Sequence, residues 1–260
     1  MVILLFPFRK CIDLNERNRR ILMLIDLLRN STYTVVYTGA GMSTESGLPD
    51  FRSAKTGLWE NEDPALVAST EAMNQDVERF FQFYRERVLG VKDCKPHNGH
   101  DILAKWENEG LIQSVITQNV DGFHSVAGSK NVIELHGTLQ KIHCQSCEKE
   151  YGNDMYEEEK FYCSCGGKLR PSVVLFGEGL PEEPFMKAVD ESEKADLFIV
   201  FGSSLTVTPA NQIPVLAKEQ GSKLVIVNME PTQFDKYADI VINDMKIGEL
   251  LAEIEMHLHS

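Results

Sequence analysis

The sequence of 260 residues has no apolar run long enough to cross a bilayer. The apolar stretch at residues 1–8 is too short, and Arg9 and Lys10 follow it, whereas the basic residues of a signal peptide precede its apolar run. No small-residue cleavage site follows this stretch. These absences argue against a signal peptide and a membrane association, and they favour a cytoplasmic protein.

Basic residues are also scarce relative to acidic ones. The chain has 26 Lys and Arg residues against 39 Asp and Glu residues, and its formal net charge is −13. Direct binding to nucleic acid is not expected, because it needs a basic surface. The acidic surface would suit a lysine-rich partner, although such a surface more often serves only solubility.

The six cysteines do not have the distribution of a secreted disulfide framework, because four of them are clustered. The cluster has a C-x2-C pair, fifteen intervening residues and a C-x-C pair, which is close to a two-knuckle zinc pattern. Four thiolate ligands leave no open position on Zn²⁺, so the metal would be structural. The predicted ligands are Cys144, Cys147, Cys163 and Cys165.

Two alternatives to this zinc site stay open. His143, which precedes the first cysteine, is a candidate substitute ligand, and the four cysteines would otherwise be free or disulfide-bonded. The second pair is shorter than usual, but Gly166 and Gly167 provide the tight turn that it needs.

Short apolar runs alternate with helical patterns outside the cysteine region. Strands that alternate with helices predict an α/β fold, a Rossmann-like parallel sheet with helices on both faces. A capping box at residues 13–16 begins the first helix, and further helices are expected after Pro181 and Pro209. The predicted strands are residues 33–37, 112–117, 132–135, 197–201, 224–227 and 240–242.

The cysteine region interrupts this pattern as an insert would. We therefore predict a single unit, residues 1–260, that contains three parts. The Rossmann-like domain would comprise residues 12–53, 92–137 and 176–260, the helical insertion residues 54–91, and the zinc-binding module residues 138–175.

The first predicted strand runs directly into a glycine pair, Gly39 and Gly41. Small residues at this point let a backbone approach a pyrophosphate, as in dinucleotide-binding units. The spacing G-x-G-x-x-T departs from the ordinary motif, and Gly47 with Pro49 prevents the long helix that usually follows. We therefore expect a rebuilt loop that ends at residues 50–52.

Polar segments follow several of the predicted strands, which is where open α/β sheets bind ligands. They are residues 39–52, here called the opening loop, residues 117–124, and residues 201–206. Asn228 and Glu230 follow a fourth strand and suit ribose hydroxyls. His136 follows another short strand. Its imidazole would accept a proton near neutral pH, or it would simply be hydrogen-bonded in a turn.

Together these segments resemble the ordered signature of the sirtuins, NAD-dependent protein-lysine deacylases. The resemblance spans about residues 30–245 and implies the predicted fold, NAD as co-substrate and one structural zinc ion. The motifs that carry it are residues 39–53, 117–124, 136–137, 176–178 and 202–204, with Asn228.

The resemblance also implies a role for each matching residue. His136 would be the catalytic base, and Asn119 would place a water molecule. Asp121 would accept from the nicotinamide carboxamide, and Phe51 would cover the reacting ribose. The residues expected to bind NAD are Gly39, Ala40, Gly41, Thr44, Asp50, Phe51, Arg52, Gln118, Asn119, Val120, Asp121, Gly202, Ser203, Ser204, Asn228, Glu230 and Asp244.

In the implied reaction, the acyl oxygen of a substrate lysine attacks ribose C1′ and nicotinamide leaves. His136 then deprotonates a ribose hydroxyl, and water releases free lysine and O-acyl-ADP-ribose. The partner would be an acylated-lysine protein or peptide that pairs with residues 174–178 strand against strand. The substrate-binding residues expected there are Val174, Phe176, Gly177 and Glu178.

The nature of the acyl group is less well defined by the sequence. Tyr84 and Arg87 have the Tyr-x-x-Arg spacing of family members that prefer succinyl or malonyl groups. The alternative is a helix face with Tyr84 packed and with Arg85 and Arg87 solvated. Residues 48–53 and 57–59 look more like the deacetylase branch of the family, so acetyl is the predicted group.

Two other reactions are alternatives. A mono-ADP-ribosyltransferase would pass the same activated ribose to a protein side chain. A hydride-transferring dehydrogenase would also bind NAD. Against it stand the interrupted helix and the lack of a plausible acidic ribose ligand on a second strand about 20 residues further on.

Overall fold

The computed structural model of this protein describes residues 14–53, 57–60 and 62–259. The apolar N-terminal stretch, the first position of the predicted capping box and part of the predicted helical insertion lie outside these residues. Within the described ranges, no helix is long and apolar enough to span a membrane.

The centre of the fold is a six-stranded parallel sheet with the strand order β3-β2-β1-β7-β8-β9. The order runs outward from β1 in one direction and from β7 in the other, so the loops after these two strands lie side by side at a topological switch point. This sheet confirms the predicted fold class. Its strands are β1 Thr34–Thr38, β2 Ser114–Thr117, β3 Val132–Glu134, β7 Leu197–Phe201, β8 Lys223–Val227 and β9 Ile240–Ile242.

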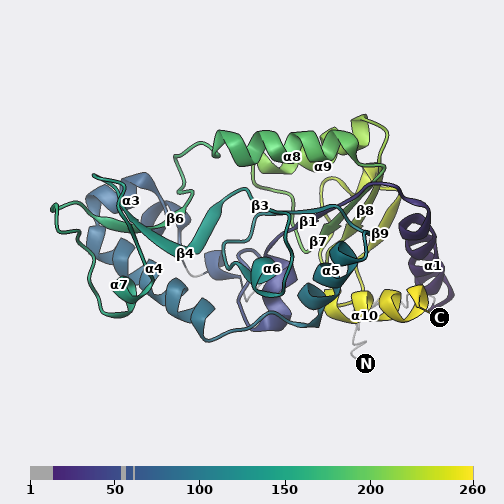
Figure 1. Cartoon of the computed structure of the whole chain (residues 1–260), viewed down its shortest axis with the longest axis horizontal. Coiled ribbons are helices and arrows are strands. Elements are labelled where there is room, and N and C mark those ends of the chain that lie inside the picture. Colours follow the sequence, from purple (N-terminus) through teal and green to yellow (C-terminus); the bar gives the residue numbers. More distant parts are fainter. Residues whose placement is uncertain (1–13, 54–56, 61, 260) are drawn as a thin grey trace, which may run out of the picture.

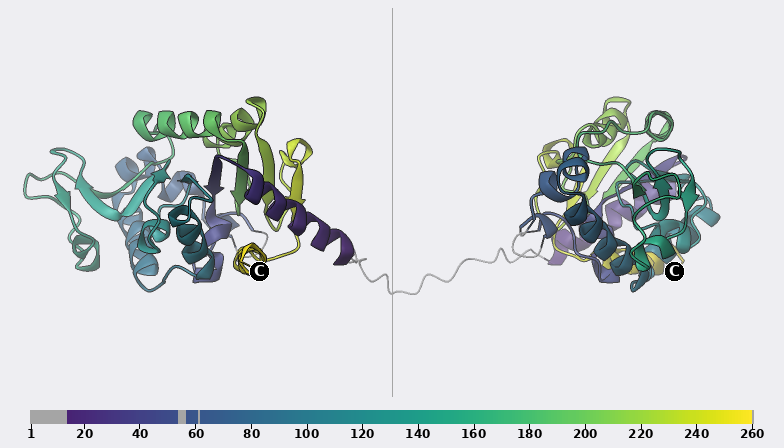
Figure 2. Two further views of the ribbon diagram at one scale, coloured as in Figure 1. Left: turned by 45° about the vertical axis from the view of Figure 1, so that its right-hand side comes forward. Right: turned by 90° about the vertical axis from the view of Figure 1, so that its left-hand side faces the viewer.

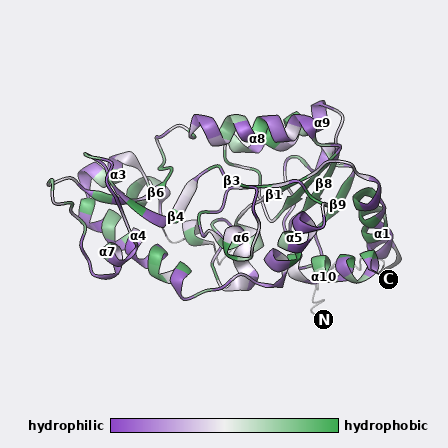
Figure 3. Cartoon of the chain, viewed as in Figure 1, coloured by the Kyte–Doolittle hydropathy of each residue, from purple (hydrophilic) through white to green (hydrophobic). Residues whose placement is uncertain are grey.

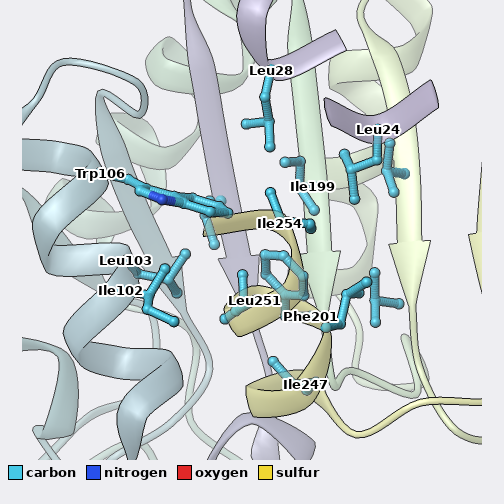
Figure 4. Close-up of a cluster of buried hydrophobic side chains, with 14 of the residues drawn as sticks. Leu24, Leu28, Ile102, Leu103, Trp106, Ile199, Phe201, Ile247, Leu251 and Ile254 are labelled. Atoms are coloured by element: carbon cyan, nitrogen blue, oxygen red, sulfur yellow. The ribbon is translucent and has the colours of Figure 1, made fainter. Parts of the chain in front are cut away.

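Helices cover both faces of this sheet (Figure 1). α1 (Leu14–Asn30), α5 (Asn98–Asn108) and α10 (Ile247–Leu258) lie on one face, and α8 (Glu182–Lys194) and α9 (Ile213–Glu219) lie on the other. Figure 4 shows side chains of α1, α5, α10 and β7 pointing toward one another in the core of the first face. The strands are mostly apolar, whereas α8 carries both kinds of residue, as a helix with one buried face should (Figure 3).

A second sheet lies at the other end of the molecule (Figure 2). It is antiparallel, has the order β5-β4-β6, and was not predicted from the sequence. Aromatic side chains from α4, including Phe80 and Phe81, pack with Tyr156 and Phe161 into the core beneath it. The elements here are α2 Pro64–Val67, α3 Thr70–Gln75, α4 Val77–Lys92, β4 Gly137–Cys144, β5 Glu150–Tyr151, α7 Asp154–Glu157 and β6 Leu169–Val173.

Short helices complete the loops of the described part. The first, η1, begins directly after Gly39 and ends where Gly47 takes the left-handed conformation, so the long helix of an ordinary nucleotide motif is absent from this loop, as predicted. The boundaries of the three predicted parts stay a prediction. The remaining short elements are η1 Ala40–Ser46, η2 Leu58–Glu60, α6 Phe123–Val126, η3 Ala210–Gln212 and η4 Asp235–Tyr237.

Candidate functional site

A cavity of about 760 Å³ lies at the carboxyl ends of the parallel strands and extends toward the second sheet. It brings together most of the residues that the sequence singled out, from segments far apart in the chain. Those that line it are Ala40, Gly41, Thr44, Asp50, Phe51, Arg52, Tyr84, Arg87, Gln118, Asn119, Val120, His136, Val174, Phe176, Gly177, Glu178, Gly202, Ser203, Ser204, Asn228 and Glu230.

The two loops at the switch point touch backbone to backbone on one side of this cavity. Gly41 N donates to Gly202 O at 2.8 Å, and a Cβ atom on Gly41 would lie 2.7 Å from Gly202 Cα. Gly202 itself has φ +65°, and its Cβ would lie 2.5 Å from Met42 N. The glycines are therefore required by the approach of one loop to the other, in addition to any approach of a ligand.

His136 follows β3 and is oriented by a backbone carbonyl. Its Nδ1 donates to Gln118 O at 3.0 Å, which leaves Nε2 unprotonated in the neutral ring. Burial lowers the pKa of His136, and the nearby Arg52 lowers it further, against the opposing effect of the bond to Gln118. The imidazole at the cavity wall is therefore neutral near pH 7 and able to accept a proton at Nε2.

Gln118 presents a buried donor without a partner. Its Oε1 accepts from Ser203 Oγ at 2.8 Å, whereas its Nε2 has no hydrogen-bond partner in the described part of the chain. A buried amide N–H that is left unpaired costs free energy, so it indicates a missing polar ligand. The resemblance implies that Gln118 holds a ribose.

A buried network lies behind the opening loop. Ser43 Oγ donates to Asp121 Oδ2 at 2.7 Å and accepts from Asn119 Nδ2 at 3.2 Å, while Phe123 N donates to Asp121 Oδ1. Burial raises the pKa of Asp121, and these donors oppose that effect. Asp121 lines a small neighbouring cavity of about 20 Å³ together with Arg87.

Tyr84 and Arg87 both reach the main cavity from α4. Tyr84 is buried, but Arg87 is only half-buried, and its Cζ lies 5.1 Å from the centroid of the Phe51 ring. Arg85 points elsewhere and pairs with Glu159 at 3.2 Å. The alternative in which Arg87 is solvated together with Arg85 is therefore wrong for Arg87.

The segment expected to bind peptide is already partly engaged. Phe176 N donates to Ala68 O, and Phe176 O accepts from Thr70 N. The Glu178 carboxylate forms a paired contact with Arg170 at 2.7 and 2.9 Å and also accepts from Leu175 N. These bonds hold the segment against α3 and β6.

The four predicted metal ligands come together at the end of the second sheet. Their Sγ atoms lie within 4.8 Å of one another. Ser146 N and Gly167 N point at Cys144 Sγ and Cys165 Sγ, each at 3.4 Å, and Gly166 takes the left-handed conformation in the second turn. A set of four soft sulfur donors fits one tetrahedral zinc ion.

Three predicted NAD-binding residues do not line the main cavity. Gly39 packs against Ser203, Asp121 faces the small cavity, and Asp244 lies outside the lining of both. The sequence reasoning missed other lining residues, chiefly Trp59, Phe83, Glu45, Met245, Lys246 and Ile247. The position of the last three, directly after β9 at the same sheet edge, was a signal that could have found them.

The fold and this cavity define a doubly wound α/β protein that binds a nucleotide-sized ligand where its strand order reverses. Comparison with known proteins then identifies the family. A family model described as the Sir2 family matches residues 39–209. The chain belongs to the Sir2 family.

Among similar proteins, an NAD-dependent protein deacetylase of Oceanobacillus iheyensis is 63% identical over 232 residues, covering 89% of this chain and 98% of that protein. An NAD-dependent protein deacetylase 1 of Geobacillus kaustophilus is 53% identical over 231 residues, covering 89% and 96%. A solved Sir2 complex with p53 peptide and NAD⁺ is 39% identical, has a TM-score of 0.82, and is matched over 90% of this chain and 97% of that one. Another Sir2 structure, which holds a deacetylated p53 peptide and 3′-O-acetyl-ADP-ribose, has a TM-score of 0.86 at 38% identity, with 91% and 98% coverage.

Proposed function

We propose that this protein is an NAD-dependent protein-lysine deacetylase that yields nicotinamide, O-acetyl-ADP-ribose and the free lysine. The names of its relatives and the ligands of the similar structures support this activity. The observation that carries the proposal is the geometry of His136, whose Nδ1–H is bound to Gln118 O so that Nε2 is free to accept a proton at the cavity wall.

The residues present fit NAD as the co-substrate. The unpartnered Nε2 of Gln118 would donate to the nicotinamide ribose, and Asn228 and Glu230 would hold the adenosine ribose. The backbone of the two glycine loops would face the pyrophosphate. When bound, NAD supplies an activated ribose carbon with nicotinamide as the leaving group.

His136 would remove the proton of a ribose hydroxyl during the transfer of the acyl group. Burial keeps the imidazole neutral, and the bond to Gln118 O fixes the tautomer with Nε2 as the acceptor. Asn119, whose Nδ2 donates to Ser43 Oγ, would place a water molecule, and Asp121 would accept from the carboxamide of nicotinamide. Phe51 would exclude water from the reacting carbon.

The acylated-lysine peptide would lie along residues 174–178. Within the described chain, Val174 O and Gly177 N have no backbone partner, so these atoms are the ones left for pairing with a peptide. Phe176 would contact the peptide through its ring, since the side chain is 44% exposed. The Glu178 carboxylate, already bound to Arg170, would position the segment.

The zinc ion would hold the antiparallel sheet and take no part in the reaction, because four thiolates complete its coordination. The four cysteines must stay reduced to bind it, which suits the reducing cytoplasm that the sequence predicts as the location. With its net charge of −13, the protein is proposed to act on peptides and to bind neither nucleic acid nor membranes.

One incubation with NAD and an acetyl-lysine peptide tests the activity class. Free nicotinamide together with O-acetyl-ADP-ribose is the expected result. Formation of NADH would indicate a dehydrogenase, and transfer of label from NAD to a protein side chain would indicate a mono-ADP-ribosyltransferase. Either of those results in place of deacetylated peptide would refute the proposal.

A second candidate is removal of an acidic acyl group, and Arg87 favours it. Its half-buried guanidinium forms no ion pair with any described residue, although the Asp121 carboxylate acts on it from a distance, so a succinyl or malonyl carboxylate would fit there. If this group is preferred, Arg87→Met lowers kcat/KM for succinyl-lysine by about tenfold to hundredfold, the value of one charge-assisted hydrogen bond. Arg85→Met is the matched control, because Arg85 pairs with Glu159 outside the cavity.

A further inference from the structure

The guanidinium of Arg87 contacts the opening loop in the absence of any acyl group. Its Cζ lies 5.1 Å from the centroid of the Phe51 ring, a cation–π distance. No hydrogen bond or ion pair to Arg87 is found in the ranges that the structure describes. The ring face of Phe51 is therefore the direct contact of this charge, and the buried Asp121 carboxylate attracts it without forming an ion pair.

The contact belongs to a longer stack that closes on a single helix. The rings of Phe51 and Trp59 are stacked with centroids 5.2 Å apart, and those of Trp59 and Phe83 are stacked at 6.1 Å. Phe83 and Arg87 are four residues apart on α4, so they lie on the same face of that helix. One helix face thus contacts both the ring of Phe51 and the ring of Trp59 that stacks on it.

The backbone of the loop is closed at the same place. Leu58 N donates to Asp50 O at 2.9 Å, and Trp59 N donates to Phe51 O at 3.0 Å. The backbone segments that carry Phe51 and Trp59 are therefore bonded to each other, so a shift of one ring should move the other. On the peptide side, Trp59 also meets the ring of Phe176 edge-on, with centroids 6.2 Å apart.

We infer that Arg87 is a positioning residue for Phe51, and that it holds this cover in place over the cofactor region whatever the charge of the acyl group. The inference rests on the proposed function only in that the covered ligand is taken to be NAD. An acyl carboxylate would engage the same guanidinium and would compete with the Phe51 ring for it. The charge of the acyl group and the position of Phe51 would then be coupled through the side chain of Arg87.

NAD affinity, measured by calorimetry without any peptide, tests this inference. Arg87→Met should raise the Kd for NAD by about threefold to tenfold, as loss of a half-buried cation–π contact implies. Arg87→Lys, which keeps the charge, should recover part of the affinity, and Arg85→Met should leave it unchanged. Emission from Trp59 should also shift in Arg87→Met, against the constant contribution of the buried Trp106.

A double-mutant cycle with Phe51→Leu shows whether Arg87 acts through the ring. The effect of Arg87→Met on the Kd for NAD should vanish in the Phe51→Leu background. An unchanged Kd in Arg87→Met, or an equal effect in both backgrounds, would overturn the inference. These affinities are measured without turnover, so they test the inference even if the protein fails to deacetylate the acetyl-lysine peptide. That failure would refute the proposed function and leave the inference about Arg87 standing.

Discussion

At the ends of the parallel strands, Gln118 Nε2 has no partner among the described residues, and the neutral His136 keeps one ring nitrogen for a ligand. In the antiparallel sheet, by contrast, the four thiols lie against one another and receive N–H groups from Ser146 and Gly167. One region places an amide side chain and a neutral imidazole at the wall of a large cavity, whereas the other gathers its four sulfur atoms around a single point.

This difference separates a site that performs chemistry from one that holds structure. Polar side chains at the wall of a large cavity can contact a ligand and exchange a proton with it. A closed set of four sulfur donors leaves no position for a substrate. The two regions should therefore respond differently to substitution, one in turnover and the other in stability.

The largest effect is expected from His136→Ala. Loss of a general base should lower kcat for deacetylation by about 10²–10⁴-fold, with the Kd for NAD nearly unchanged. Steady-state kinetics and calorimetry measure the two quantities. His143→Gln is the control, because His143 is bonded to Ser172 and does not line the cavity. Full activity of His136→Ala would remove the distinction between the two regions.

Loss of zinc should act on the other region. Cys147→Ser, or treatment with a chelator, should release the metal and lower the melting temperature by on the order of 10 °C, because zinc binding and folding of such a module are coupled. Metal content and a thermal melt check this. Cys94→Ser should change neither, since Cys94 lies outside the four-cysteine cluster. If Cys147→Ser keeps its zinc, another ligand completes the site.

Gly202→Ala tests the contact between the two loops of the cavity. The added Cβ would have both a strained φ and a backbone nitrogen at 2.5 Å, so the free energy of unfolding should fall by about 3 kcal/mol. Gly221→Ala shares the positive φ, at +98°, but meets no atom within 4 Å, so about 1 kcal/mol is expected. Equal losses in denaturant titrations of the two variants would mean that the loops do not constrain each other.

The smallest effect concerns pH. Because burial lowers the pKa of His136, the base should be unprotonated at pH 7 and should become protonated only below the ordinary value of about 6.5. The rate of deacetylation at saturating NAD should therefore be flat around neutrality and should fall only in more acidic solution. A profile of kcat against pH checks this. If the rate begins to fall above pH 7 as the solution is acidified, a group other than His136 is responsible.

The fold was largely predictable where burial alone determines it. β7 and β9 agree with the prediction to the residue, because both are short apolar runs bounded by polar residues. β2 begins two residues later than predicted, since Ile112 packs in the core after α5 instead of pairing in the strand. The antiparallel sheet was not predictable, because β5 has only two residues and a register shift between Thr138 and Ile142 breaks the regular alternation of β4.

The candidate site shows the same division. Residues that directly follow a strand, such as His136 and Asn228, could be predicted to meet at one sheet edge. Trp59 and Phe83 could not, because their role depends on how α4 packs beside the opening loop. The orientation of His136 was also out of reach, since a backbone carbonyl provides it.

The most direct test of the account is the stoichiometry of a single reaction with NAD and an acetyl-lysine peptide. Nicotinamide, O-acetyl-ADP-ribose and deacetylated lysine are quantified together by mass spectrometry. Equal amounts of all three are expected from the zinc-loaded protein, together with their loss in His136→Ala. Nicotinamide release without deacetylated peptide, or NADH as the product, would contradict it.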